Sequence, residues 1–425
     1  MTTQLERIAV LAKTKPKQVF TSLAHLLTVE FLVETWKQLN QRGAAGLDGE
    51  TTKAFESNLR PRCQNLVERL KAGRYRPMPV RRVDIPKGDG KTRPLGIATV
   101  EDRLVQRAVA RILGAIYEQD FLPCSYGFRP TRGAHDAVRE LRNQFMAGMV
   151  TTVFETDIRG FFDHLNHQWL LRMLKVRVAD TKILRLICRW LKAGAMVNGL
   201  LVRSEEGSPQ GGPISPLLAN VYLHYALDLW FQKRYIKEVR GNAYLTRYAD
   251  DFVAAFQYGT EAAKFEVAVK ERLKQFNLEL AENKTNRIRF GRLPSMQGKE
   301  TGTFVFLGFQ HVAGRDRQGR FAVIRLPAQK SCSRFLDTVK TELRKKPHAR
   351  GPDQQWMLLR KLRGFYHYYG LNGCLSRLNR VRFNILYAWR KAIRRQGQRS
   401  KAQWFRLNRH NWFDLPYPTV LHPNV

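Results

Sequence analysis

Three aspartates have the spacing and the surroundings of a metal site. Asp157 follows a short expected strand, and Asp250 and Asp251 are adjacent at the tip of an expected hairpin over residues 243–256. Adjacent carboxylates repel each other, and a divalent cation removes that cost. Carboxylate oxygens suit Mg²⁺, which binds one or two carboxylates together with substrate phosphates. Three carboxylates from two strand ends could hold two such ions for an in-line phosphoryl displacement.

An ordinary turn is the alternative for the adjacent pair. Aspartate is common in turns, where its side chain is solvated. Asp250 and Asp251 taken alone are compatible with that alternative, and so is Asp157 taken alone. The surrounding sequence therefore has to decide between a solvated turn and a metal site.

The composition favours a large anionic partner. The 425 residues, enough for two or three domains, include 73 Lys and Arg against 36 Asp and Glu, a formal net charge of +37. Nucleic acid is the commonest large polyanion. Acidic lipid is the alternative, but the charge is spread along the chain rather than gathered in one tail. No run approaches the ~18 apolar residues of a membrane span, so we expect no membrane partner.

The cysteines indicate a reducing compartment. The five residues stand at positions 63, 124, 188, 332 and 374, far apart and without a C-x-x-C pair. A disulfide framework or a cysteine-based zinc module is therefore not expected.

Apolar periodicity and turn residues divide the chain into short elements. Helices are expected within residues 1–60 and at 61–75, 101–118, 134–146, 166–174, 182–192, 217–231 and 261–276. Strands are expected at 80–85, 151–154, 243–248, 252–256, 303–309 and 321–326.

The segment from Arg325 onward is helical and more basic, with 22 Lys and Arg against 4 Asp and Glu. Its helices, over 358–369 and 375–395, interleave basic and aromatic residues. That mixture suits phosphate neutralisation and base stacking. Aromatic residues at helical spacing also suit the core of a helical bundle, and we expect both roles in one separate module.

Seven sequence blocks, in order over roughly residues 40–310, resemble those of reverse transcriptases. Tyr248-Ala249-Asp250-Asp251 resembles the Y-x-D-D box, and Asp157 stands where the motif A aspartate would, 93 residues earlier. The others are Ile85–Lys87 with Arg93–Ile97 (fingers hairpin), Ser125–Pro130 (typical of bacterial group II intron enzymes), Ser208–Leu217 (the P-Q-G motif B), Asn283–Thr285 (motif D) and Phe304–Phe309 (primer grip).

A later signature narrows the resemblance. Residues 363–369, R-G-F-Y-H-Y-Y, resemble the thumb or maturase X domain of group II intron proteins. No H-N-H block with paired cysteines is present in the sequence. The chain thus resembles a bacterial group II intron-encoded reverse transcriptase and maturase of the form that lacks an endonuclease.

The resemblance implies an α+β fold. It is a right-hand polymerase of fingers and a palm with a small antiparallel sheet, followed by an α-helical thumb or maturase X domain. The expected domains are an N-terminal helical extension (1–60), fingers (61–150), palm (151–325, with the motif B helix at 207–231) and thumb (326–425).

The resemblance also assigns the reaction centre. Asp157, Asp250 and Asp251 are the expected catalytic residues, and with Ile158 they form the expected metal site. Two Mg²⁺ ions and dNTP substrates are the implied cofactor and substrates. Glu155 shares a strand face with Asp157 by two-residue alternation, and we expect it to be a peripheral charge rather than a ligand.

Five residues are expected to bind the incoming nucleotide. Lys87 and Arg93 would hold the triphosphate, because Arg grips phosphate oxygens through paired hydrogen bonds and Lys supplies a point charge. Gln210 would contact the nucleotide, and Lys284 would protonate or position the leaving pyrophosphate. Phe162 would be the aromatic gate that excludes a ribose 2′-hydroxyl, with the adjacent phenylalanine as its competitor.

The thumb supplies the expected nucleic-acid contacts. These are Arg363, Tyr366, Tyr369, Arg390 and Lys391. The implied partners are the parent group II intron RNA, an RNA template with a DNA primer, and a target DNA, in the bacterial cytoplasm at the nucleoid.

The implied function is extension of a DNA 3′-hydroxyl on intron RNA, together with assistance of splicing as a maturase. A bacterial reverse transcriptase of the same lineage with a repair or phage-defence duty is one alternative. A splicing maturase with an unused polymerase is another, although a pure binder has no need of three clustered carboxylates.

Overall fold

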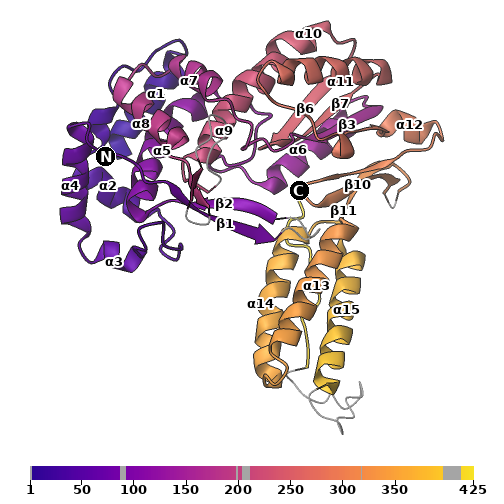
Figure 1. Ribbon diagram of the computed structural model, residues 1–425. Helices are drawn as coiled ribbons and strands as arrows, with labels where there is room; N and C mark the ends of the chain where they lie inside the picture. The colour runs from indigo at the N-terminus through magenta and orange to yellow at the C-terminus, as the bar shows by residue number, and fades with distance from the viewer. Residues whose placement is uncertain (1, 87–91, 198–199, 203–210, 317, 396–412) are drawn as a thin grey trace.

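The computed structural model describes residues 2–86, 92–197, 200–202, 211–316, 318–395 and 413–425. Two α/β halves lie side by side, and a narrow helical bundle projects from beneath them (Figure 1). Lys87, Gln210 and the Gly88–Gly90 turn lie outside the described residues.

The first half is mainly helical. Its helices are α1 (Thr2–Thr14), η1 (Ala24–Leu26), α2 (Val29–Trp36), α3 (Thr52–Glu56), α4 (Leu59–Lys71), α5 (Val100–Asp120), α7 (His167–Lys175) and α8 (Thr181–Lys192). Side-chain caps fix several starts, as where the Thr99 hydroxyl accepts from the Asp102 amide at 3.1 Å. The long α5 packs along α1 and α2, so the N-terminal residues share the fingers core.

A small sheet extends from this half toward the thumb (Figure 1). Its strands are β1 (Val80–Pro86), β2 (Thr92–Ile97), β4 (Ala195–Val197) and β5 (Leu200–Val202), in the order β2-β1-β4-β5. Arg93 of β2 lies opposite Ile85 of β1, so the fingers hairpin forms in the register that the sequence suggests.

The second half is built on an antiparallel sheet in the order β6-β7-β3-β8. The strands are β3 (Thr152–Asp157), β6 (Ala243–Tyr248), β7 (Asp251–Phe256) and β8 (Asn286–Arg289). Helix α11 (Gly259–Lys274) covers one face, where the Phe265 ring lies 5.4 Å from Phe154. Helix α6 (Ala134–Ala147) covers the other, where Phe145 lies 5.0 Å from Phe290.

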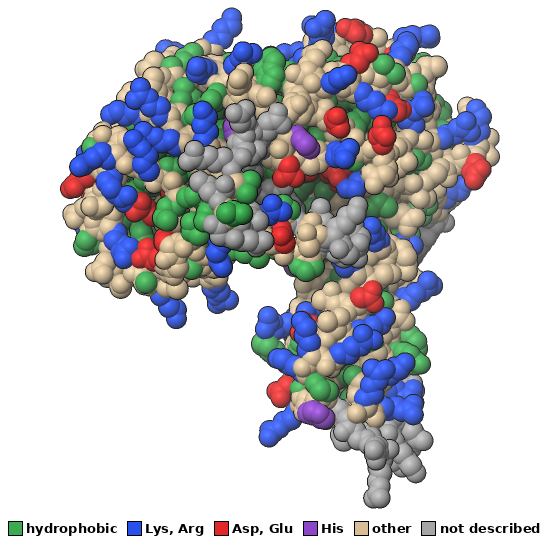
Figure 2. Space-filling model, viewed as in Figure 1, with side chains coloured by type: hydrophobic (Ala, Val, Ile, Leu, Met, Phe, Trp, Pro, Cys, Tyr) green, Lys and Arg blue, Asp and Glu red, His purple; other side chains and the backbone are tan. Residues whose placement is uncertain are grey.

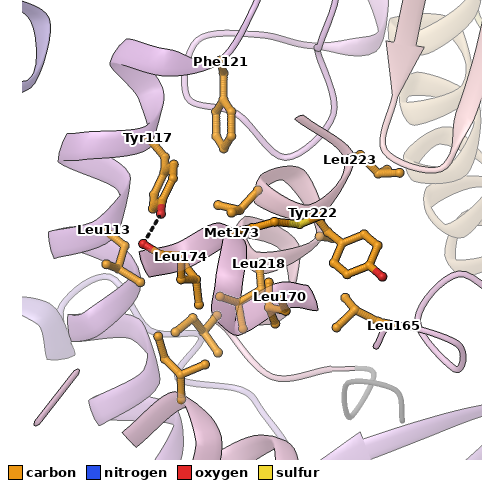
Figure 3. Packing of buried hydrophobic residues seen from close by; sticks show 14 of the residues in the cluster. Leu113, Tyr117, Phe121, Leu165, Leu170, Met173, Leu174, Leu218, Tyr222 and Leu223 are labelled. Atoms are coloured by element: carbon orange, nitrogen blue, oxygen red, sulfur yellow. Dashed lines mark hydrogen bonds between the residues drawn. The ribbon is translucent and has the colours of Figure 1, made fainter. Parts of the chain in front are cut away.

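The expected helix at 217–231 is longer and less regular than an α-helix. It comprises α9 (Ser215–Leu223), the π-helical turns η2 (His224–Asp228) and η3 (Phe231–Tyr235), and α10 (Ile236–Glu238). Figure 3 shows how α9 packs on the first half: Leu218 and Tyr222 lie among Leu170, Met173 and Leu174 of α7 and Tyr117 of α5.

A second hairpin sheet leads into the thumb. After η4 (Glu282–Lys284) and α12 (Arg292–Met296), the strands β9 (Thr303–Phe306), β10 (Phe309–Arg315) and β11 (Phe321–Pro327) pair in the order β11-β10-β9. Leu307 and Gly308, with φ of 51° and 77°, make the tight β9–β10 turn.

The thumb is a bundle of α13 (Gln329–Lys345), α14 (Gly351–Tyr369) and α15 (Leu375–Arg394). Residues 413–425 return along it, and the Phe413 ring packs 4.6 Å from the fully buried Trp389. No helix among the described residues is both long and apolar enough to cross a membrane.

Candidate active site

The strand register places the three aspartates at one end of the palm sheet. Ala249 and Asp250 form the turn between β6 and β7, Asp251 is the first residue of β7, and Asp157 is the last residue of the neighbouring β3. In the strand register Asp157 lies directly opposite Asp251. Pairing of β3 with β7 therefore brings together carboxylates that are far apart in the sequence, as expected.

Backbone contacts fix this turn. Ala249 has a left-handed φ of 57°, which a non-glycine residue adopts only in special turns. The Ile158 amide donates to the Asp250 carbonyl at 3.2 Å, and the Ile158 side chain is buried. Gly127 lies directly behind the turn, since a Cβ at that position would approach the Ala249 amide nitrogen to 2.5 Å. The Ser125–Pro130 block is thus the support of the aspartate turn.

The site carries an excess of negative charge. Burial, and then the charges of Asp157 and Asp250, raise the pKa of Asp251 to about 8. The positive charge of Lys284 offsets part of this negative charge, because its ammonium group forms an ion pair with Asp157. The hydrogen bond to Asp157 is the main cause that raises the pKa of Lys284. The protein therefore supplies one cation of its own where carboxylates gather.

Lys284 reaches this position through the segment before β8. The Ala281 amide donates to the Asp157 carbonyl at 2.8 Å, and the hydroxyls of Thr156 and Thr285 lie 2.7 Å apart. Within the described residues, no three acidic, His or Cys side chains converge as a metal-binding group in this conformation. The carboxylate oxygens near the turn are of the type that a hard divalent cation prefers.

The two candidate gate residues have different surroundings. Phe161 is 2% exposed, and its ring packs against Tyr222 of α9 at 6.2 Å. Phe162 is 9% exposed and contacts the Phe161 ring edge-on at 5.3 Å. Phe161 is thus fixed in the core, and Phe162 is the more accessible ring of the pair.

The motif B glycines lie against the protein itself. Gly211, with φ of +114°, would bring a Cβ to 2.6 Å from the Gly96 carbonyl oxygen of β2. A Cβ on Gly212 would lie 2.6 Å from Oε1 of the buried Gln106 on α5. Glycine is required at position 211, because the backbone there has a positive φ and lies against the backbone of β2. This contact ties the start of α9 to the fingers hairpin.

The sequence interpretation placed Glu155 at the periphery, and the structure gives it a linking role. Its carboxylate accepts from the Asn286 side-chain amide at 2.9 Å and from the Val305 backbone amide at 3.1 Å. Burial raises the pKa of Glu155. The side chain joins β3 to β9 of the primer-grip hairpin. In the sequence, the two-residue alternation that places Glu155 on the same strand face as Asp157 is the signal that could have indicated this linking role.

The thumb residues divide between surface and core. Arg363 and Lys391 are exposed and Arg390 is partly exposed. Tyr366 and Tyr369 are 5% and 8% exposed. The Tyr366 hydroxyl donates to the Pro416 carbonyl at 3.2 Å, and Tyr369 packs on Phe309 at 5.0 Å. Packing of the thumb is the role that the structure gives to these two tyrosines.

Comparison with known proteins agrees with this geometry. Residues 85–311 match the family model described as "Reverse transcriptase (RNA-dependent DNA polymerase)". Protein YkfC of Escherichia coli is 33% identical over 77% of this chain and 93% of its own length. The group II intron-encoded protein LtrA of Lactococcus lactis is 29% identical over 97% of this chain and 81% of its own length.

A shorter match reaches a eukaryotic relative. Nuclear intron maturase 1 of Arabidopsis thaliana is 34% identical over 22% of this chain and 13% of its own length. The matches confirm the resemblance to group II intron-encoded enzymes, and the mixed architecture agrees with a right-hand polymerase followed by a helical domain. The chain belongs to the reverse transcriptase family of RNA-dependent DNA polymerases.

Proposed function

We propose that Asp157, Asp250 and Asp251 hold two Mg²⁺ ions for RNA-templated DNA synthesis, with the Ile158 backbone beside them. The carrying observation is the register that places Asp157 opposite Asp251 at one sheet end, within the matched reverse transcriptase region. When bound, the ions would favour the ionised primer hydroxyl and neutralise charge on the transferring and leaving phosphates.

The protein's own residues would arrange the other reactants. The primer 3′-oxygen bonds to the α-phosphorus of the dNTP, the bond to pyrophosphate breaks, and the hydroxyl proton is released. Lys284, which forms an ion pair with Asp157, would position the pyrophosphate or protonate it once the ions occupy the site. Phe162 would contact the sugar, and Arg93, Lys87 and Gln210 would bind the rest of the nucleotide.

Binding of Mn²⁺ in place of Mg²⁺ tests the ligand set without reliance on turnover. Calorimetry or Mn²⁺ spectroscopy should detect two sites in the wild-type protein with a dNTP present. We expect loss of at least one site in Asp157→Asn and in Asp250→Asn. Asp163→Asn, six residues beyond Asp157, is the control. Unchanged stoichiometry in both active-site variants would refute the assignment.

We also propose that the partner is a group II intron RNA that serves both as template and as splicing substrate, with a DNA primer and a target DNA at the bacterial nucleoid. The full-length similarity to LtrA and the net charge of +37 support this. Arg363, Arg390 and Lys391 of the thumb would contribute phosphate contacts. RNA recovered from the purified native protein should be enriched in one structured intron. Recovery of only bulk cellular RNA would favour the repair or phage-defence alternative.

A further inference from the structure

We infer that Arg247 and Asp228 are positioning residues that hold the aspartate turn in register with the motif B helix. The inference rests on the proposed metal site. It concerns an ion pair that is fully buried and would act on the site through the backbone of the turn.

Arg247 is the centre of a buried polar network. Arg247 and Asp228 are both 0% exposed. The guanidinium donates from Nε to Oδ1 of Asp228 at 2.7 Å and from Nη2 to Oδ2 at 2.6 Å. Such a two-pronged pair fixes the orientation of the guanidinium plane as well as its position.

The remaining guanidinium hydrogens reach three other segments. Nη1 donates to the Ala249 carbonyl at 2.9 Å and to Oδ1 of Asn220 at 3.1 Å, and Nη2 donates to Oγ of Ser125 at 2.7 Å. Ala249 is the residue with positive φ in the aspartate turn. Arg247 therefore holds the carbonyl of the most strained residue of the turn, immediately before Asp250.

Two of the partners of Arg247, Asn220 and Asp228, lie on one continuous helical segment. Asn220 is in α9, which begins after the motif B loop, and Asp228 ends the π-helical turn η2. Each residue of a π-helical turn rotates the chain about the helix axis by a smaller angle than a residue of an α-helix does. Asn220 and Asp228 therefore lie closer to the same face of the segment. π turns of this kind often occur at functional sites. A shift of the motif B helix would therefore move the aspartate turn through Arg247.

Stability alone is a weak reason to keep this pair. Burial of two charges costs desolvation energy that their attraction often only balances, so buried pairs are frequently replaceable by apolar residues. The contact to the Ala249 carbonyl, in contrast, needs the planar fork of an arginine. The geometry points to control of the turn.

The test compares Mg²⁺ dependence of RNA-templated dNTP incorporation in wild-type, Arg247→Lys and Asp228→Asn proteins. The expected result is that half-saturating Mg²⁺ rises about tenfold, the size of one lost hydrogen bond to a charged group. kcat at standard Mg²⁺ should fall, while KM for the dNTP changes little. Excess Mn²⁺, which binds such sites more tightly, should restore part of kcat.

A second buried pair in the same chain provides a matched control. Nε of Arg177 lies 3.0 Å from Oδ2 of Asp120, and their side chains are 2% and 15% exposed. Asp120→Asn should lower thermal stability and leave half-saturating Mg²⁺ unchanged. If half-saturating Mg²⁺ rose as much in Asp120→Asn as in Asp228→Asn, general destabilisation would explain both effects, and the inference would be overturned.

Folding of the variants is checked by circular dichroism. If Arg247→Lys and Asp228→Asn do not fold, Asn220→Ala decides, because it leaves the ion pair intact while it removes the hydrogen bonds of Asn220 to Arg247 and to the Gly127 carbonyl. A smaller rise in half-saturating Mg²⁺ is then expected. Unchanged Mg²⁺ dependence in the folded variants overturns the inference and leaves the proposed function standing. Absence of Mg²⁺-dependent incorporation by the wild-type protein would instead refute the proposed function.

Discussion

At the scale of single residues, Asp251 is the carboxyl whose protonation most affects the metal site. Its pKa is raised to about 8 by burial and by Asp157 and Asp250. The metal-free native state thus holds a proton that the unfolded chain releases near pH ~4. The free energy by which the protonated Asp251 carboxyl favours the native state is fully present below pH ~4, and it is lost as the pH rises to about 8.

The affinity of the site for a divalent cation should rise with pH, whereas the contribution of Asp251 to stability falls. Because cations bind the ionised carboxylate, apparent Mn²⁺ affinity should increase toward pH 8, by up to about tenfold per pH unit for one competing proton. Binding titrations at pH 6, 7 and 8 measure this. Asp251→Asn should flatten the profile. A wild-type affinity that does not change between these pH values would contradict the charge balance described for the site.

Sugar selectivity is a second prediction at this scale. Phe162→Val should raise ribonucleotide incorporation relative to dNTP incorporation by roughly ten- to a hundredfold, since a smaller side chain leaves room for the 2′-hydroxyl. Phe161→Val should lower stability by about 1–3 kcal/mol without that change, because Phe161 packs in the core. Competition between NTP and dNTP in primer extension distinguishes the two variants. If Phe162→Val selected dNTP over NTP as strongly as the wild-type protein does, Phe162 would not be the gate.

The residues found from the sequence alone are those whose chemistry is visible in a short motif. The aspartates and Lys284 stand in such motifs, and the structure brings them together. Arg247 adjoins the same box but was missed, because its role depends on Asp228, which has no motif of its own. Glu155 was underestimated for the same reason: its partners, Asn286 and Val305, come from later strands.

At the scale of elements, the thumb is tied to the primer-grip turn by its aromatic residues. The Tyr368 hydroxyl donates to the Leu307 carbonyl at 2.9 Å, and a Cβ on Gly308 would meet the Tyr369 hydroxyl at 2.6 Å. The R-G-F-Y-H-Y-Y signature therefore joins two elements. Helical spacing predicted that its aromatic residues pack, but it could not predict that they pack on β9–β10, which is a long-range contact.

Gly364 of α14 is exposed, and nothing lies within 4 Å of where its Cβ would stand. Glycine inside a helix costs about 1 kcal/mol relative to alanine. Gly364→Ala should therefore stabilise the protein by ~0.5–1 kcal/mol. If the thumb binds nucleic acid beside Arg363 as proposed, Gly364→Ala should also weaken binding of an RNA–DNA duplex, because the added methyl group would stand between the helix and the duplex.

Thermal unfolding and duplex binding measure the two effects. Gly114 of α5 is the matched control, since it also lies in a helix with no atom within 4 Å of a Cβ. Gly114→Ala should leave duplex affinity unchanged. Equal duplex affinity for wild-type and Gly364→Ala would show that the thumb glycine has no contact role.

At the scale of the whole molecule, the basic side chains and the hydrophobic clusters are distributed differently. One hydrophobic cluster runs from Ala12 to Leu280 through both α/β halves, and a second fills the thumb. Lys and Arg side chains are scattered over the surface of both parts in the view of Figure 2. The first cluster contains residues on both sides of the expected boundaries at residues 60 and 150. Helix α1 packs against α5, and the Tyr117 hydroxyl of α5 donates to the Leu174 carbonyl of α7. Short sequence motifs do not report such long-range packing.

This charge distribution predicts a steep salt dependence of RNA binding. Each neutralised phosphate of single-stranded RNA contributes a slope of about −0.7 in log K against log salt, so several contacts should lower affinity by orders of magnitude. Arg363→Ala should reduce the slope by about one contact. Filter binding between 50 and 500 mM salt measures it. A flat response would contradict a phosphate-binding surface.

RNA-templated primer extension by wild-type and Asp250→Ala proteins tests the central claim most directly. Both proteins are matched for folding, with a DNA primer, an RNA template, dNTPs and Mg²⁺ supplied. We predict incorporation by the wild-type protein and at least about a thousandfold loss in Asp250→Ala, since a metal ligand supplies several kcal/mol of transition-state stabilisation. No incorporation by the wild-type protein, or equal incorporation by both, would contradict the account.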